Sequence, residues 1–555
     1  MTAAPIMGRS LIALLVVWSV VQAFFLPTAF RIDEPNIIAI ARQTATEPLD
    51  PYGFTINWNG TEESAFTTLA NPPLVPAWLA LWARVFGWSE TSLHLAMLPF
   101  SLIALIAFGS IARDLKIASP VIGAAALACS PAFFLSAQVV MPDIAMVALL
   151  ASSVALTLRY LATNSASIFA LAALCAALTP LMKYNGVVLT VVLAGFCVVA
   201  PQRRRQLGLL TLASLAGVGV WSLANIAIYG EPHFTASSRL QGGAAVSALT
   251  GALIALGLGV LPFALAFRTR MPAAAGRVWK LALPVIAIAL ALLAAFTLEY
   301  PVIPSILFAA GGTIAIHFLA SSIWNAVDDW RSGRGIEAVL VIWIIATFAL
   351  QFQLLFTAVR YLLPLAIPVI LLGLRSLSPS PGGRGSRGEG PLATQTGTSA
   401  SLWGTLAINA LFVLALGIGD ARTANLYRAF IDREVAPLVD DATGTLHFDG
   451  HWGLQHYAEE LGGIAVDRRN PPKLAPEDIL IGARNAFPAG GRSVRNEVVI
   501  HADPRWPLRT IDCDGAANFH GNAIGGCRFF PVYLPFAFGS GPVETFMIAR
   551  TGGSE

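Results

Sequence analysis

Residues 93–112, LHLAMLPFSLIALIAFGSIA, form an apolar run without a single Asp, Glu, Lys or Arg. A helix of about 20 apolar residues is long enough to cross the hydrocarbon core of a bilayer. The whole chain has this character, because 56% of its 555 residues are hydrophobic and only 12% are charged. A soluble domain carries about 25% charged residues. The sequence therefore excludes an ordinary soluble enzyme, a disordered chain and a nucleic-acid-binding protein, and it predicts a polytopic membrane protein.

Further apolar runs predict membrane-spanning helices along most of the chain. They lie at residues 11–30, 118–137, 142–161, 166–182, 186–201, 208–229, 245–267, 281–298, 303–323, 337–356, 361–376 and 402–419. With the quoted run they make about thirteen spans, so the predicted fold class is an all-α polytopic membrane protein. Residues 72–82 are too short for a span and are rich in Trp and Pro, which favours a helix in the membrane interface.

Lys and Arg residues in short loops predict the orientation of the chain, because cytoplasmic loops carry an excess of them. With the N-terminus inside, Arg113, Lys116, Arg159 and the run 203–205 all fall in inner loops. An odd number of spans then places the C-terminal region outside. The sequence therefore predicts a multi-pass protein of the inner (plasma) membrane with a cytoplasmic N-terminus. The first span lacks a small-residue cleavage site and is predicted to be an uncleaved anchor.

Composition divides the chain into a transmembrane domain, residues 1–420, and a polar tail, residues 421–555. Within the transmembrane domain, residues 31–92 are predicted to form the first outer loop with its interfacial helices. Residues 377–400 are low in complexity and cationic, which predicts a flexible cytoplasmic linker.

The polar tail contains turn signals and short strand-like runs, for example residues 497–500 and 543–548. Residues 452–462 are predicted to be helical. These features together predict a small periplasmic α+β domain. Cys513 and Cys527 would pair in an oxidising compartment, and two free thiols are the alternative.

Ionisable residues gather at the outer ends of the predicted spans, whereas the span interiors are nearly free of charge. They are Asp33 and Glu34 after the first span, Asp143 at the start of the fourth, Lys183 after the fifth, and Arg360 with Tyr361 before the twelfth. All of them fall at one depth on one side of the membrane. The simpler alternatives are carboxylates that cap helices or face solvent, and cations that snorkel to lipid headgroups.

This pattern suits a lipid-linked sugar whose phosphate lies at the membrane interface. Breaking the sugar–phosphate bond leaves charge on the phosphate oxygens, which a fixed guanidinium or ammonium stabilises. Arg360 and Lys183, with Tyr361 beside them, are the donor-phosphate candidates. The attacking hydroxyl or amine must lose a proton to a carboxylate within hydrogen-bond reach. Asp33 is the predicted general base, with Glu34 or Asp143 orienting the acceptor.

His233 and Asn71 are candidates for an acceptor or loop contact in the outer region. No second His or Cys with metal-ligand spacing lies near His233, so an ordinary loop residue is the simpler interpretation. His447, His451 and His456 in the tail have loose spacing for zinc. No metal or other cofactor is therefore predicted, although a divalent metal stays an alternative.

The order of these motifs resembles that of integral-membrane glycosyltransferases of the protein O-mannosyltransferase and aminoarabinose–lipid A transferase type. The resemblance covers residues 10–376. It rests on Asp33-Glu34, Asn71-Pro72-Pro73-Leu74, Asp143, Lys183-x-x-Gly186 and Arg360-Tyr361-Leu362-Leu363-Pro364.

The resemblance implies the C-type glycosyltransferase fold and a lipid-phosphate-sugar donor. The resemblance implies that a sugar passes with inversion from polyprenyl phosphate to an acceptor outside the cytoplasm. It also implies that Asp33 activates the acceptor and that Arg360 and Lys183 hold the donor phosphate. The family often has His or Lys where this chain has Asn71, which puts a metal or phosphate role there in doubt. The sequence leaves open the sugar, the oligomeric state and whether the acceptor is a lipid, a glycan or a protein.

The alternative function is a transporter or flippase of lipid-linked saccharides. Transporters place ionisable residues near the bilayer midplane on broken helices. Here the ionisable residues lie at the span ends, and His317 is the main exception. A structural membrane subunit would need no convergence of acids and bases. The pattern therefore favours the enzyme, with membrane lipids and a polyprenyl-phosphate sugar as its partners.

Overall fold

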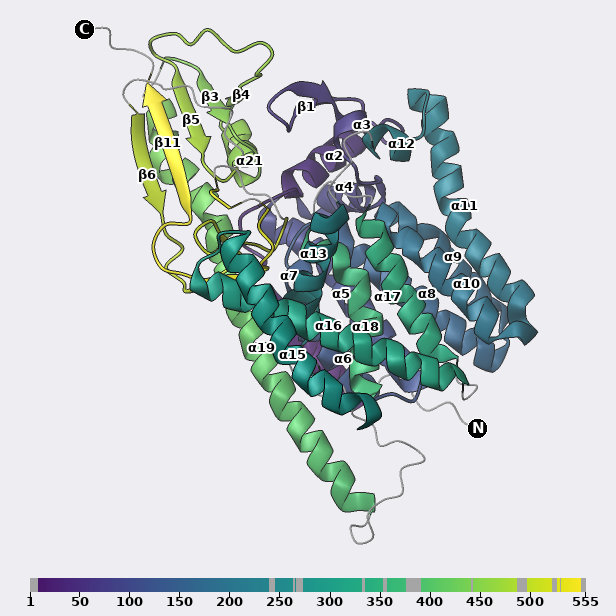
Figure 1. Cartoon of the computed structure of the whole chain (residues 1–555). Coiled ribbons are helices and arrows are strands. Elements are labelled where there is room, and N and C mark those ends of the chain that lie inside the picture. Colours follow the sequence, from purple (N-terminus) through teal and green to yellow (C-terminus); the bar gives the residue numbers. More distant parts are fainter. Residues whose placement is uncertain are drawn as a thin grey trace.

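The computed structural model describes residues 8–238, 245–262, 265, 273–331, 335–352, 357–375, 391–440, 443–486, 497–521, 527–529 and 531–550. Most of the described chain is helical, and a small sheet lies in the C-terminal region (Figure 1). Residues 377–390 of the predicted linker lie outside the described ranges. Its last residues, 391–400, are instead the beginning of α19 (Pro391–Phe430). Proline suits this position, because the first helical residue has no intrahelical partner for an N–H.

Helices occupy each range in which the sequence predicts a span. They are α1 (Arg9–Ala23), α5 (Glu90–Asp114), α6 (Pro120–Ala128) with α7 (Pro131–Ser136), α8 (Pro142–Thr163), α9 (Ala166–Met182), α10 (Val188–Val199), α11 (Arg204–Tyr229), α13 (Ala245–Ala255), α15 (Ala273–Phe296), α16 (Val302–Arg331), α17 (Ile336–Gln351), α18 (Leu363–Arg375) and α19. Six helices in the described ranges are long and apolar enough to cross a membrane, and shorter apolar helices accompany them. The structure is thus a helical membrane protein as predicted, while the count of about thirteen spans stays a prediction.

Breaks in the helices fall where the sequence has proline or a polar residue. The predicted span 118–137 is divided at Pro131, which has no N–H to continue the helix. Lys183 lies between α9 and the 3₁₀ turn η1 (Tyr184–Val187). Arg360 lies in another 3₁₀ turn, η4 (Val359–Leu362), directly before α18. The sequence-predicted cations therefore lie on tight turns at helix ends, where their side chains need not point into lipid.

The predicted first outer loop, residues 31–92, contains α2 (Glu34–Thr46), the β1–β2 hairpin (Thr55–Asn57 and Glu62–Ser64), α3 (Ala65–Thr68) and α4 (Leu74–Phe86). Helix α4 coincides with the predicted interfacial helix. It packs against α2 and α5, and the indole of Trp78 donates a hydrogen bond of 3.0 Å to the carbonyl of Ala96 in α5. The loop is therefore fixed onto the helical bundle.

The C-terminal region contains a five-stranded sheet in the order β4-β3-β5-β11-β6. Its strands are β3 (Leu446–Asp449), β4 (Ile464–Ala465), β5 (Ile479–Ala483), β6 (Glu497–Ala502) and β11 (Glu544–Arg550). β3 runs parallel to β4 and β5, whereas β11 runs antiparallel to β5 and β6. Helix α21 (Gly453–Glu460) packs against β3 and matches the predicted helix. This confirms the predicted C-terminal region that combines helix and strand.

Residues 508–521 form a loop beside this sheet, which we call the C-terminal loop. It contains the short strands β7 (Leu508–Arg509), β8 (Ile511–Asp512) and β9 (Ala517–Asn518), and β7 pairs with β10 (Ala537–Phe538). Cys513 and Cys527 form the predicted disulfide, with a Cα–Cα distance of 5.3 Å. The sheet, α2 and the β1–β2 hairpin lie at one end of the helical bundle (Figure 1). The candidate site lies at that end.

Candidate active site

A tight turn at residues 31–34 presents the first acidic group. The N–H of Glu34 donates to the carbonyl of Arg31 at 3.0 Å, and the N–H of Arg31 donates to the Glu34 carboxylate at 2.6 Å. Between them Ile32 has a φ of 51°. A β-branched residue with positive φ is a strained backbone conformation that surrounding contacts must hold. The turn therefore depends on its neighbours for its shape.

Glu34 belongs to the framework of this turn. Its carboxylate is fully buried, accepts a 2.6 Å hydrogen bond from the N–H of Val140, and lies 3.3 Å from the His94 ring. Burial acts to raise the pKa of Glu34, but His94, Arg31 and the Val140 amide outweigh it and lower that pKa. The buried carboxylate is held by these contacts and also lines the pocket described below, so the role of Glu34 in orienting the acceptor stays a prediction.

Four charged side chains from distant parts of the chain converge beside the turn. Asp33 forms an ion pair with Arg360, and Lys183 Nζ lies 2.6 Å from a carboxylate oxygen of Asp143. The ring of Tyr361 joins the two pairs, with Lys183 Nζ 4.4 Å and Arg360 Cζ 5.1 Å from its centre. Cations over an aromatic face are attracted by its electron density. The predicted acids and cations thus form one cluster, which we call the charged cluster.

The members of the charged cluster differ in exposure. The side chains of Arg360, Lys183 and Asp143 are 4%, 8% and 1% exposed, whereas that of Asp33 is 24% exposed. Charges away from water interact more strongly than charges at the surface. The cluster therefore combines buried cations with one accessible carboxylate.

The simpler interpretations of these residues do not fit the geometry. Asp33 precedes α2, but its side chain makes no capping hydrogen bond. Asp143 lies inside the first turn of α8 and bonds Lys183 instead of capping the helix. Both cations are too buried to reach lipid headgroups. The carboxylates and cations are therefore paired with one another.

His233 and Asn71 lie in a separate aromatic cluster. The His233 ring stacks on Tyr52 at 4.4 Å and contacts the Tyr184 hydroxyl at 2.7 Å and the Leu69 carbonyl at 2.8 Å. The hydroxyl of Tyr52 donates to the carbonyl of Asn71. Burial lowers the pKa of His233 to about 4. His233 is thus a neutral, buried ring that braces the first outer loop.

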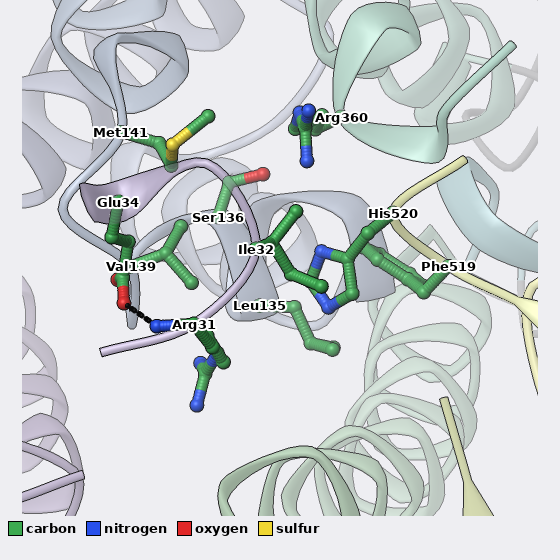
Figure 2. A pocket seen from close by; sticks show the side chains of 10 residues that line it. All are labelled: Arg31, Ile32, Glu34, Leu135, Ser136, Val139, Met141, Arg360, Phe519 and His520. Carbon is green, nitrogen blue, oxygen red and sulfur yellow. Dashed lines mark hydrogen bonds between the residues drawn. The ribbon is translucent and has the colours of Figure 1, made fainter. Parts of the chain in front are cut away.

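A small pocket adjoins the charged cluster (Figure 2). Its lining includes Arg31, Ile32, Ser136, Arg360 and His520. His520 comes from the C-terminal loop, so the C-terminal region contributes directly to the walls of the site. The sequence analysis predicted neither His520 nor Arg31 as a site residue. No sequence pattern connects His520 with Arg31. The only available signal was the position of Arg31, a cation two residues before Asp33.

An apolar groove lies between α13, α16 and α17. Leu249, Leu253, Leu319, Ile344 and Phe348 are among the side chains that line it. Its lining is almost entirely apolar, which suits a hydrocarbon chain. In the described ranges, no group of three or more His, Cys, Asp or Glu side chains could hold a metal ion.

Residues 70–228 match the family described as dolichyl-phosphate-mannose-protein mannosyltransferase. This match confirms the resemblance to membrane glycosyltransferases that was inferred from the motifs. Among curated proteins none matches the chain.

Solved glycosyltransferases are similar to the chain at low sequence identity. ArnT from Cupriavidus metallidurans bound to undecaprenyl phosphate is 14% identical, with 86% of this chain and 94% of that chain covered and a TM-score of 0.48. The Archaeoglobus fulgidus oligosaccharyltransferase, in complex with Zn and sulfate, is 11% identical over 84% of this chain and 67% of that one, with a TM-score of 0.44. The arabinofuranosyltransferase AftD from Mycobacteria is 12% identical over 99% and 40%, with a TM-score of 0.42.

Proposed function

We propose that the protein transfers a sugar from a polyprenyl-phosphate donor to an extracytoplasmic acceptor with inversion at the anomeric carbon. The observation that carries the proposal is the accessible carboxylate of Asp33 beside the buried Arg360 and Lys183. A group that meets an acceptor must be reachable, whereas groups that stabilise charge act best away from water. The charged cluster has one reachable carboxylate, Asp33, and two buried cations, Arg360 and Lys183.

Arg360 and Lys183 would hold the donor phosphate. Arg360 bonds Asp33 through one terminal nitrogen, while its Nε is buried without a hydrogen-bond partner. A guanidinium has five N–H donors in a fixed fork, so it can bind phosphate oxygens and a carboxylate together. As the sugar–phosphate bond breaks, the electron pair stays on the phosphate oxygen, and both cations stabilise the charge that develops there.

Asp33 would act as the general base. The acceptor hydroxyl or amine gives its proton to the Asp33 carboxylate while its oxygen or nitrogen forms a bond to the anomeric carbon. Attack from the face opposite the phosphate inverts the configuration at that carbon. The products are the glycosylated acceptor and polyprenyl phosphate. Asp143 would keep the Lys183 ammonium in place through their 2.6 Å contact.

The apolar groove between α13, α16 and α17 would accommodate isoprenoid units of the donor. Thr357, close before Arg360, lies against α13, so the groove borders the segment that carries the phosphate-binding cation. A lipid chain in the groove would leave its phosphate near the membrane surface. In the predicted topology this surface is the periplasmic one.

Transfer assays with labelled polyprenyl-phosphate sugars test the proposal. The purified wild-type protein, given a membrane extract as acceptor source, should release polyprenyl phosphate and label an acceptor. Asp33→Asn keeps the size of the side chain but cannot accept the proton, so transfer should fall at least about 100-fold. The variant should retain wild-type expression and melting temperature. Normal transfer by Asp33→Asn would refute the base assignment, and no transfer by the wild type with any such donor would refute the proposed function.

A further inference from the structure

The C-terminal loop contacts the strained turn of the first outer loop through a buried network. The guanidinium of Arg31 lies 2.9 Å from one carboxylate oxygen of Asp420 in α19. The other oxygen of Asp420 lies 2.9 Å from the His520 ring and accepts a 2.6 Å hydrogen bond from the hydroxyl of Thr510. Arg31, Asp420 and His520 are all buried. Asp420 thus connects the turn to both ends of the C-terminal loop.

The same loop holds the segment that carries Arg360. The backbone N–H of Val359 donates a 3.1 Å hydrogen bond to the carbonyl of Phe519, the residue before His520. Asp33 and Arg360 form an ion pair, so one loop fixes the backbone next to both partners. Figure 2 shows Phe519 and His520 on the side of Ile32 away from Glu34.

Other contacts from the C-terminal region also reach the strained turn. The N–H of Ala29 donates to the side chain of Asn425 at 2.9 Å, and the N–H of Phe30 donates to the hydroxyl of Tyr457 at 2.8 Å. Gly419 lets the backbone of α19 approach Leu508 closely, because a Cβ at this position would collide with the Leu508 carbonyl. Thr510, which lies between β7 and β8, is thereby brought beside Asp420.

We propose that Arg31, Asp420 and His520 are positioning residues, through which the C-terminal loop sets the conformation of the Ile32–Asp33 turn. The inference rests on the proposed function of Asp33. Ile32 needs external support to keep its positive φ, and the buried ion pair supplies it. A shift of about 1 Å in a reacting group costs about 100-fold in rate. The C-terminal region therefore acts on the transfer step by holding the backbone that carries Asp33.

Steady-state kinetics of Asp420→Asn in the full-length protein test the positioning role. The substitution keeps the shape of the side chain but removes the charge that holds Arg31. We expect kcat to fall between about 10- and 100-fold, while the KM for the donor changes less than about twofold. His520→Gln leaves Asp420 in place, so it should also lower kcat, but by a smaller factor than Asp420→Asn. Arg31→Lys should retain more activity than Arg31→Met, because Lys keeps the positive charge.

Arg528→Met is the matched control, because Arg528 also pairs the C-terminal region with the membrane domain. Its partner Glu299 lies 3.4 Å away, and the pair is 77% and 71% exposed. We expect wild-type kcat and KM for this control. A rise in donor KM as large as the fall in kcat for Asp420→Asn, or an equal effect of Arg528→Met, would overturn the positioning role.

Hydrogen–deuterium exchange provides a readout that does not require activity. In Asp420→Asn, amides of residues 29–37 should exchange about tenfold faster than in the wild type, while those of α8 stay unchanged. If the wild type showed no transferase activity but residues 29–37 still exchanged faster in Asp420→Asn, the proposed function would have failed while the positioning network was supported. Unchanged exchange in this segment would overturn the network itself.

Discussion

Ion pairs between distant segments occur in two settings at the end of the molecule that holds the candidate site, and the settings differ in burial. In the charged cluster, Arg360 is 4% exposed and its partner Asp33 is 24% exposed. In contrast, Arg469 and Glu63, which join the C-terminal region to the β1–β2 hairpin at 2.8 Å, are 63% and 27% exposed. Coulombic energies grow severalfold when water is excluded. Only the buried pairs can therefore stabilise charge in a reaction, whereas the exposed pairs mainly join surfaces.

The largest effect in this comparison is expected for Arg360→Ala. Loss of one positioned donor to developing charge typically costs about 100- to 1,000-fold in rate, so kcat/KM for the donor should fall by about this factor. The KM for the acceptor should change far less. Arg84→Ala, which removes an exposed arginine of the first outer loop, is the control and should leave both constants unchanged. An unchanged donor constant in Arg360→Ala would remove its phosphate role.

Glu544 in β11 extends the comparison to a buried carboxyl group held by hydrogen bonds. It accepts a 2.6 Å hydrogen bond from the Tyr427 hydroxyl and a 3.0 Å bond from the N–H of Asn485. Burial raises the pKa of Glu544 to about 7, although Tyr427, the amides of Asn485 and Thr545, and Arg484 oppose the rise. The folded protein therefore binds this proton more tightly than the unfolded chain does.

The stability contributed by protonated Glu544 should accordingly be present below about pH 4.5 and be lost as the pH rises to about 7. Its full size is on the order of 3 kcal/mol. We expect the melting temperature of the wild type to fall between pH 5 and pH 8, and that of Glu544→Gln to fall less. Fluorescence-monitored melting of the detergent-solubilised protein measures both. Parallel pH profiles for the two proteins would contradict the assignment.

The smallest effect is expected for the exposed pair. Glu63→Gln should change the free energy of unfolding by less than about 1 kcal/mol, because surface ion pairs are screened and constrain mobile side chains. Transfer activity should stay within about twofold of the wild type. Melting and kinetic assays on the variant check both statements. A loss of activity comparable with that of Arg360→Ala would show that the exposed and buried pairs are not distinct in role.

The positions of the helices could be read from the sequence because apolar runs of bilayer length leave few alternatives. The members of the charged cluster could also be predicted from the sequence, because Asp33, Asp143, Lys183 and Arg360 interrupt the apolar pattern at one predicted depth. The sequence could not separate the surroundings of Asp33 from those of Glu34. Neighbouring carboxylates look alike in sequence, yet Asp33 faces the cluster and Glu34 is buried beneath the turn.

The amino-acid sequence by itself determined the membrane class, the helical segments, the strand-containing C-terminal region and the identity of the charged groups. These follow from local composition and periodicity, which require no knowledge of distant contacts. Only the tertiary structure decided that Asp33 pairs with Arg360, that Asp420 connects Arg31 to His520, and that His233 is enclosed by aromatic rings. Such contacts join residues that are at least 100 positions apart. Their geometry depends on how helices pack and where buried charges find partners, and neither is encoded in any single segment.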